Sequence, residues 1–353
     1  MARKSTLVTR LTDFFERIGR RRLWIQTHDI PDPDAIASAE AFRLIAKHFG
    51  KSAKIVTNGL PNRRENNALI RECRIHLTPL ESVSIRSRRS SAWAYLDCLP
   101  GNGNVTLHPL APGDIYFAID HHGRPGKILT GDPNAIMYID RTVGATATIL
   151  TKGLLELGIG FPPRLASALS YAIITDTQDF SRGASEPDIM IYSELFHRTN
   201  QRIMSRLRNV TQPRDYFRRL HTSLENAYFY RHVAWVDIGE VRTGESVAET
   251  ADFILSCERI TWALAVGRSG DRLFLSMRSS KPDARCHRVI ARIIRPLSGA
   301  VAVHSEMAGG FVRIGEGDDS GEIAEGIVTR FLRTVMHIPK SAENPEGTLL
   351  ISE

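Results

Sequence analysis

Short apolar runs and segments of helical periodicity alternate along residues 1–200. Leu7, Leu11 and Phe14 recur at helical spacing and predict an amphipathic helix over residues 5–19, packed on the first domain. Further elements are predicted as strands at 23–26, 53–57, 92–96 and 115–119, and as helices at 35–49, after 148 as far as 158, and from 163 towards 176. Strands that alternate with helices predict an α/β fold with a mainly parallel sheet.

The pattern changes after residue 200. Residues 201–230 are polar and rich in arginine, with apolar positions interspersed, and they predict a helical connector between domains. Beyond the connector, strands are predicted at 232–236, 261–266 and 272–278, and helices at 246–256, 284–295 and 321–336. We therefore expect a first domain at 1–200, a smaller α/β domain at 231–340, and a tail at 341–353 that lacks periodicity and is disordered.

Composition narrows the class of protein. A chain of 353 residues exceeds what one hydrophobic core usually supports, in agreement with two domains. The four cysteines are widely separated and form no C-x-x-C pair, which argues against a disulfide framework or a thiolate zinc site and predicts a reducing, cytoplasmic location. No apolar run approaches the roughly 20 residues of a membrane-spanning helix, so a soluble protein without membrane contact is expected.

The charge balance favours anionic partners. The net charge is +7 and the sequence pI is about 9.4, which favours nucleotides, phosphates or nucleic acid as partners. The arginine runs at 20–22 and 86–89 agree with this reading, although most such runs are solvated surface.

Metal-capable side chains follow the first predicted strand. His28, Asp32 and Asp34 lie on the connection between that strand and the next helix. Asp32 is also a natural N-cap, with Pro33 at the first helical position, but a cap requires only one acid. The spacing H-x-x-x-D-x-D can direct one imidazole and two carboxylates into the same crevice, and this donor mixture suits Mn²⁺ better than calcium or structural zinc.

Three other connections repeat this layout. Asp97 follows the strand at 92–96, Asp120, His121 and His122 follow the strand at 115–119, and Asp176 follows the apolar stretch that begins near 163. Each residue taken alone is equally consistent with a turn or a cap. Because ligands bind outside the carboxyl ends of parallel strands, their repetition predicts a single metal site at that edge.

At these residues the sequence resembles the DHH phosphoesterase family. The resemblance rests on residues 28–39, Asp97, Asp120-His121-His122 and residues 174–180, and covers most of residues 20–200. It implies two Mn²⁺ ions, with Mg²⁺ or Co²⁺ as substitutes. The implied ligands of one ion are His28, Asp32, Asp97 and Asp176, and those of the other are Asp34, Asp97, His121 and Asp176. The implied catalytic set is Asp97, Asp120, His121 and His122, in which His122 contacts substrate phosphate and Asp120 fixes the histidines.

The second half resembles the DHH-associated C-terminal domain. Arg278, after a predicted strand, matches the arginine of that domain, and His304, Gly309 and Gly310 match its glycine-rich histidine loop. The resemblance implies that these residues bind the phosphate end of the substrate. The chain departs from the family at 299–303, where Gly-Ala-Val-Ala-Val stands in place of several glycines before His304.

Together these features predict a hydrolase with its site between the two domains. The resemblance implies that a water activated by two metal ions attacks phosphorus in short oligonucleotides, cyclic dinucleotides or pAp-like nucleotides, as in nanoRNase and pAp-phosphatase types. The alternatives are a catalytically weak nucleotide-binding or regulatory protein of the same fold and, less favoured by chain length, a single-strand-specific exonuclease. An inorganic pyrophosphatase agrees less well with the aromatic, basic second domain. A homodimer is left open.

Overall fold

The alternating pattern of the N-terminal half builds a parallel sheet. The computed structural model describes residues 5–59, 61, 63–83, 91–101, 105–106, 115–122, 134–281, 284–295, 297, 299–303, 307–315, 317–339, 341–343 and 345–351. They form two compact units, residues 1–211 and 212–353. The predicted α/β class, with a mainly parallel sheet followed by a smaller mixed unit, is confirmed.

The sheet of the first unit has six strands, in the order β3-β2-β1-β4-β5-β6. The strands are β1 (Arg22–Gln26), β2 (Ala53–Thr57), β3 (Leu77–Pro79), β4 (Ser91–Leu96), β5 (Ile115–Asp120) and β6 (Ala135–Ile139). All neighbouring strands are parallel. The chain reverses its direction of travel across the sheet between β1 and β4, and such a reversal leaves a crevice at the carboxyl ends of the two strands.

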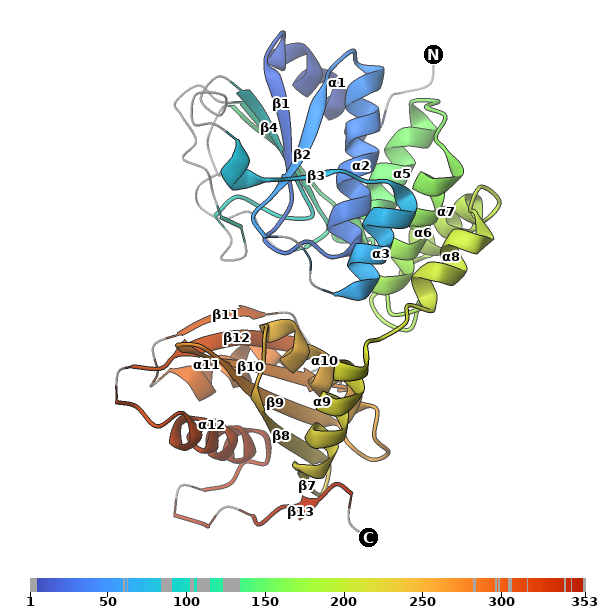
Figure 1. Cartoon of the computed structure of the whole chain (residues 1–353). Coiled ribbons are helices and arrows are strands. Elements are labelled where there is room, and N and C mark those ends of the chain that lie inside the picture. The colour runs from blue at the N-terminus through green and yellow to red at the C-terminus, as the bar shows by residue number, and fades with distance from the viewer. Residues whose placement is uncertain are drawn as a thin grey trace. The chain divides into compact units, whose positions relative to one another are not determined.

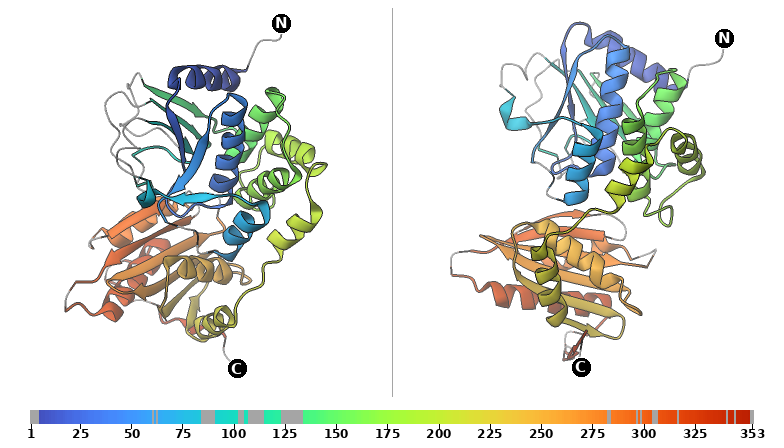
Figure 2. Two further views of the ribbon diagram at one scale, coloured as in Figure 1. Left: turned by 45° about the horizontal axis from the view of Figure 1, so that its top comes forward. Right: turned by 45° about the vertical axis from the view of Figure 1, so that its right-hand side comes forward.

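Helices cover one face of this sheet (Figures 1 and 2). They are α1 (Thr6–Ile18), α2 (Pro33–His48), α3 (Arg64–Cys73), α5 (Thr146–Glu156), α6 (Pro163–Asp176), α7 (Glu186–Phe196) and α8 (Gln201–Arg208). A short 3-10 helix, η1 (Leu80–Ser82), contributes Leu80 to the other face of the sheet. The predicted apolar stripe of α1 is buried, and its Phe14 ring lies 5.3 Å from that of Phe117 on β5. On the opposite face, Trp24, Trp93 and Tyr95 form a separate cluster with Leu80 and Val83.

The second unit contains a seven-stranded mixed sheet, in the order β11-β12-β10-β9-β8-β7-β13. Its strands are β7 (Ala227–Tyr230), β8 (Val233–Glu240), β9 (Trp262–Ser269), β10 (Arg272–Ser279), β11 (Gly299–Val303), β12 (Met307–Arg313) and β13 (Thr348–Leu349). Its helices are α9 (Arg214–Glu225), α10 (Gly244–Leu255), α11 (Cys286–Ile294) and α12 (Ser320–Val335). Only β8 and β9 pair in parallel among the described pairs.

The predicted helical connector contains two helices that pack in different units, and part of the predicted tail forms a strand. Residues 201–208 form α8, which packs on α3 and α6 in the first unit, whereas 214–225 form α9, which packs on β8 in the second. The expectation of a disordered tail is wrong for Thr348 and Leu349, because they pair with Phe229 and Tyr228 of β7. A two-residue strand is too short to produce a recognisable alternation in the sequence.

Two further expectations concern an arginine run and membrane-spanning helices. The arginine run at 86–89 lies outside the described residues. Across the described part of the chain, no helix has the length and apolar character needed to cross a membrane.

Asp188 connects three segments of the first unit. Its buried carboxylate accepts hydrogen bonds from Gly144 N (2.8 Å), Thr148 Oγ1 (2.5 Å), and the amide and hydroxyl of Ser185 (2.8 and 2.6 Å). Ser185 and Asp188 form the capping box of α7. A Cβ atom on Gly144 would lie 2.7 Å from Gly183 O and from Thr177 Cγ2, so the approach held by Asp188 requires glycine.

We expect Asp188→Asn to lower the free energy of unfolding by about 2–3 kcal/mol, because the amide brings donors against donors at a buried site. Urea denaturation measures this change. Asp13→Asn, at an exposed pair with Arg17, is the matched control and should cost less than about 0.5 kcal/mol. Equal effects of the two substitutions would contradict the connecting role of Asp188.

Candidate metal centre

The six predicted metal ligands come from four connections of the first unit. His28 follows β1, Asp32 caps α2 and Asp34 lies in its first turn. Asp97 follows β4, and His121 follows β5. Asp176 is the last residue of α6, so it reaches the same edge from the helical layer rather than from a strand. The sheet therefore brings together side chains that are far apart in the sequence.

The distances between these side chains show a tight cluster. His28 Nε2 lies 3.7 Å from Asp32 Oδ1 and 3.9 Å from Asp97 Oδ2. His121 Nε2 lies 3.9 Å from Asp34 Oδ2, 3.7 Å from Asp97 Oδ1 and 3.0 Å from Asp176 Oδ2. Donor atoms group within 4.8 Å of one another in three sets: Asp97, His121 and His122; His28, Asp32 and Asp97; Asp34, His121 and Asp176.

The shared members of these sets suit a pair of adjacent divalent cations. Asp97 belongs to two sets, as a bridging carboxylate would, and His121 also belongs to two. His121 Nε2 is buried and, within the described residues, has no hydrogen-bond partner of suitable geometry, although it lies 3.0 Å from Asp176 Oδ2. An orphaned ring nitrogen among carboxylate oxygens fits a cation ligand, since buried polar atoms are otherwise nearly always paired.

Asp97 adopts a strained backbone conformation. Its φ is +58°, in the left-handed region that costs an L-residue other than glycine roughly 1–2 kcal/mol. Its amide donates to Ile119 O at 2.9 Å, so β5 holds the bend in place. Ile30, between His28 and Asp32, has a φ of +55°, which is rarer still for a β-branched residue. Strain of this kind persists where the surrounding structure over-determines it, typically at functional sites.

Asp34 is oriented by the start of α5. Its two carboxylate oxygens accept from Thr146 N at 2.7 Å and Ala147 N at 2.8 Å. The preceding residue, Ala145, supplies no side-chain cap, so Asp34 satisfies the orphan amides of that helix from another element. The Thr146 hydroxyl also donates to Asp97 Oδ1 at 2.9 Å. Thr146 thus aligns two of the candidate ligands at once.

Asp120 holds His122 rather than joining the cluster itself. Its Oδ1 accepts from His122 N at 2.8 Å and lies 3.1 Å from His122 Nδ1. The imidazole of His122 packs against that of His121, with ring centroids 3.8 Å apart, and its side chain is 37% exposed. Buried Asp120 therefore fixes an exposed imidazole at the rim of the candidate centre.

Acids and histidines of the cluster shift one another's protonation. Burial opposes the charged form of His28, but the carboxylates of Asp32 and Asp97 raise its pKa to about 9. Burial likewise opposes the charge on His121, and the nearby Asp176 and Asp97 raise its pKa to about 9. For His122, Asp120 and Asp97 overcome burial and raise the pKa to about 12.

The carboxylates shift in different directions. Burial and the charges of Asp97 and Asp176 hold the pKa of Asp34 well above its ordinary value. Burial raises the pKa of Asp97 as well, aided by the charge of Asp32. For Asp32, whose side chain is 46% exposed, partial desolvation raises the pKa but the neighbouring His28 lowers it by more, so the net shift is downward. Without a cation, the cluster therefore retains protons that cation binding must displace.

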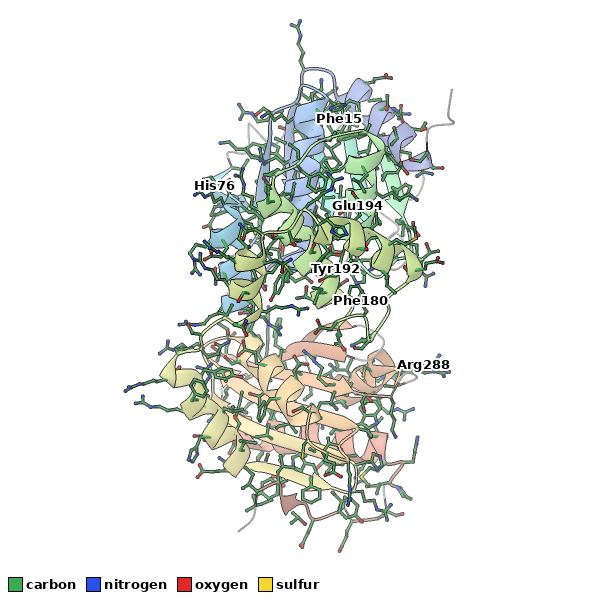
Figure 3. The ribbon with its side chains drawn as sticks, turned by 90° about the vertical axis from the view of Figure 1, so that its right-hand side faces the viewer. Phe15, His76, Phe180, Tyr192, Glu194 and Arg288 are labelled. Carbon is green, nitrogen blue, oxygen red and sulfur yellow. The ribbon has the colours of Figure 1, made fainter. Side chains whose placement is uncertain are left out.

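The end of α6 is closed by a left-handed run. Gln178, Asp179 and Phe180 have φ values of +47°, +53° and +63°. Phe180 packs edge-to-face on Tyr192 of α7, with ring centroids 5.0 Å apart (Figure 3), and Arg208 of α8 bonds Asp179 at 2.9 Å. These contacts hold the turn that directly follows Asp176.

The second unit places the predicted substrate residues on two paired strands. Arg278 and Ser276 lie on β10, and Gly309 of β12 is the partner of Ser276 in the register, with Gly310 beside it. The guanidinium of Arg278 is engaged by Asp252 of α10, through Nε at 2.5 Å and Nη2 at 3.5 Å. His304 lies outside the described residues.

Sequence reasoning missed some residues that support candidate site residues in each unit. Thr146, Asp188 and Asp252 act on other side chains through hydrogen bonds that cross between elements. Thr146 opens the helix after Gly144, and its place at a helix start is the only sequence signal that could have pointed to it. Asp188 lies in an S-x-x-D capping box, which signals a helix start but not the bonds to Gly144 and Thr148. Asp252 has no local pattern that distinguishes it from an ordinary helical acid.

Comparison with known proteins agrees with the motif order. Residues 22–173 match the model of the DHH family, N-terminal domain. The N-terminal unit is a DHH-family domain. The matched region includes five of the six candidate ligands and ends three residues before Asp176, the sixth.

The curated relatives of this chain match it over about half of their own length. An uncharacterized protein of Methanocaldococcus jannaschii is 30% identical over 258 residues, which are 73% of this chain and 52% of that protein. A probable manganese-dependent inorganic pyrophosphatase of Enterococcus faecalis is 28% identical over 151 residues, 42% of this chain and 46% of the pyrophosphatase. The chain spans about half the length of these relatives.

A solved structure shares the fold of the whole chain. The exopolyphosphatase-related protein of Bacteroides fragilis superposes with a TM-score of 0.75, covering 94% of this chain and 97% of that one, at 16% identity. At this identity the likeness concerns the fold, which includes a second unit after the DHH domain.

We expect Asp97→Asn to abolish divalent-metal binding while leaving the metal-free protein at least as stable. Asparagine tolerates the left-handed conformation better than most residues, and the substitution removes a buried charge beside other carboxylates. Isothermal titration with Mn²⁺ and thermal denaturation in EDTA measure the two effects. A variant that binds Mn²⁺ normally, or that melts several degrees lower without metal, would contradict the assignment of Asp97 as a strained ligand.

We expect the stabilisation by Mn²⁺ to grow as the pH rises from 6.5 to 9. The raised pKa values of His28 and His121 stabilise the metal-free fold below pH 6.5, and this contribution is lost as the pH rises towards 9. Over the same range the imidazoles become neutral and can bind metal. The difference in Tm with and without Mn²⁺ measures the effect.

His28→Gln is the matched control for this pH dependence. It should reduce the number of protons released on Mn²⁺ binding, as measured by calorimetry in buffers of different ionisation enthalpy. A metal-induced Tm shift that is the same at pH 6.5 and pH 9 would mean that these histidines are not ligands.

Proposed function

We propose that this protein is a metal-dependent phosphoesterase that hydrolyses short oligonucleotides, cyclic dinucleotides or pAp-like nucleotides. The observation that carries the proposal is the convergence of His28, Asp97, His121 and Asp176 in overlapping donor groups that share Asp97 and His121. The donor set of imidazoles and carboxylates supports Mn²⁺, with Mg²⁺ or Co²⁺ as substitutes. The similarity to a probable manganese-dependent pyrophosphatase supports the same metal.

The proposed ligands divide between two cations. His28, Asp32, Asp97 and Asp176 would hold one, and Asp34, Asp97, His121 and Asp176 the other. When bound, the pair of ions lowers the pKa of a water molecule and neutralises charge on the oxygens around phosphorus. Asp97 lies between the two groups, and its hydrogen bond from Thr146 fixes the direction of its lone pairs.

His122 supplies a positive charge at the rim of the centre. Asp120 keeps its imidazole protonated, since the pKa of His122 is raised to about 12. A cationic, partly exposed imidazole can donate to a phosphate oxygen and stabilise the charge that develops during hydrolysis. This chemistry needs no nucleophilic serine or cysteine, because a water molecule attacks phosphorus. Cys98, next to Asp97, is buried and its pKa is raised, so its thiol is a poor nucleophile.

The second unit supports an organic phosphoester as substrate. Arg278 is a cationic fork, and Gly309, which pairs with Ser276 on the same strand as Arg278, lets a ligand approach the backbone. The net charge of +7 agrees with an anionic substrate. We propose that Arg278, His304, Gly309 and Gly310 bind the phosphate end of the nucleotide.

A substrate panel tests this function. The purified protein with Mn²⁺ is incubated with pApA, cyclic di-AMP, pAp and inorganic pyrophosphate, and release of mononucleotide or phosphate is measured. We expect hydrolysis of at least one nucleotide, and a loss of at least about a thousandfold in Asp97→Ala, because both cations lose a ligand.

Two competing functions give different results in the same panel. Turnover of pyrophosphate alone would favour a pyrophosphatase, the activity named for the Enterococcus faecalis relative. Saturable nucleotide binding without turnover of any substrate would favour a catalytically weak nucleotide-binding protein. The observation that favours this alternative is the ion pair between Arg278 and Asp252, because it occupies the proposed phosphate ligand.

A further inference from the structure

The Arg278 fork already holds a carboxylate. Its Nε donates to Asp252 Oδ1 at 2.5 Å, and its Nη2 lies 3.5 Å from Asp252 Oδ2. On the other side, Nη1 donates to Ser276 Oγ at 2.8 Å and to Met277 O at 3.1 Å. Most of the donors that would bind a phosphate are therefore engaged within the second unit.

The two partners differ in exposure. The side chain of Arg278 is only 12% exposed, whereas that of Asp252 is 49% exposed on α10. Ser276 and Met277 hold the guanidinium from its own strand, so it is anchored without Asp252. A displacement of the Asp252 carboxylate would therefore leave the guanidinium held by Ser276 Oγ and Met277 O.

Gly309 stands at a position where a small side chain would fit. A Cβ atom on Gly309 would meet Leu275 O at 3.5 Å and Ser276 Oγ at 3.8 Å, which are ordinary contacts. Its φ is not in the left-handed range either, so neither backbone geometry nor packing with the described residues demands glycine at this position. The missing side chain leaves room next to Ser276, the residue that also bonds Arg278.

We propose that Asp252 is an internal competitor for the anion-binding fork of Arg278, so that it sets how tightly the protein binds phosphate. The carboxylate occupies the face of the guanidinium that a phosphoryl group would take and cancels its charge. A substrate phosphate binds by displacing it. Asp252 is thus a specificity-determining residue, and its assignment rests on the proposed function only in taking Arg278 as a phosphate ligand.

The test compares Asp252→Asn with a matched charge control. Asparagine keeps an acceptor for Arg278 Nε but removes the charge, and Glu258→Gln removes one charge from an exposed pair with Arg259. The probe is adenosine 5′-thiomonophosphate, which carries a phosphoryl group and resists hydrolysis. Its Kd is measured by calorimetry on the full, metal-loaded chain at two salt concentrations.

We expect Asp252→Asn to lower the Kd about fivefold to tenfold, because a like charge next to the bound phosphate is removed. Binding should also become more sensitive to salt, since the anion then neutralises an uncompensated guanidinium. Glu258→Gln should change the Kd less than about twofold, because its charge lies at an exposed pair.

A double substitution identifies the fork as the cause. Arg278→Gln should weaken probe binding more in the Asp252→Asn background than in the parent chain, because only there is the guanidinium free of its competitor. An unchanged or weaker affinity in Asp252→Asn, or an equal gain in Glu258→Gln, would overturn the proposal and leave the pair as a clamp between α10 and β10.

This result is independent of turnover. If no substrate is hydrolysed but Asp252→Asn tightens probe binding through Arg278, the proposed function fails and the competitor role stands. If nucleotides are hydrolysed and Asp252→Asn leaves the Kd unchanged, the competitor role alone fails.

Discussion

Repulsion between buried acids is the constraint on which the first unit depends. Asp34 and Asp97 are buried next to each other and next to Asp176, so their ionised forms oppose one another in a poorly solvated space. The fold tolerates this arrangement by retaining protons on acids and imidazoles until a cation replaces them. Charge compensation, rather than apolar packing, therefore determines whether the side chains in the crevice between β1 and β4 hold protons or a cation.

The scaffold around the crevice prevents the acids from moving apart. Asp34 is held by two backbone amides of α5, and Asp97 by Thr146 and by the bend that β5 stabilises. Asp188 ties the turn before α5 to α7. Local strain and hydrogen bonds thus preorganise the candidate ligands, which is what a rigid metal centre requires.

Most of the candidate metal ligands, and many helices and strands, could be predicted from the sequence because each leaves a signal in a short segment of the chain. Strand ends followed by His or Asp carry their own signal, and the sheet rule places them at one edge without knowledge of the contacts. The helical stripe of α1, the strands β1, β2, β4 and β5 of the first unit, and the strands β8, β9 and β10 of the second unit were also evident from periodicity. The sequence did not predict β3, β6, β7, β11, β12 or β13. For β3 and β13 the reason is their length, because two or three residues carry too little pattern.

The supporting contacts could not be predicted because they join distant parts of the chain. Asp252 pairs with Arg278 across 26 positions, and Thr146 reaches Asp97 across 49. Such pairings depend on how helices rest on a sheet, and no spacing rule encodes them. The bond between Arg278 and Asp252 in particular changes the meaning of a residue whose identity alone indicated an open anion site.

The pairing of β13 with β7 has a consequence for handling the protein. Without Thr348 and Leu349, the amides and carbonyls of β7 on that side would face solvent, next to the exposed Tyr228. An unprotected edge strand is a template for intermolecular pairing and aggregation. Thr348 and Leu349 therefore protect the edge of β7, and loss of this two-residue strand would favour self-association of the protein.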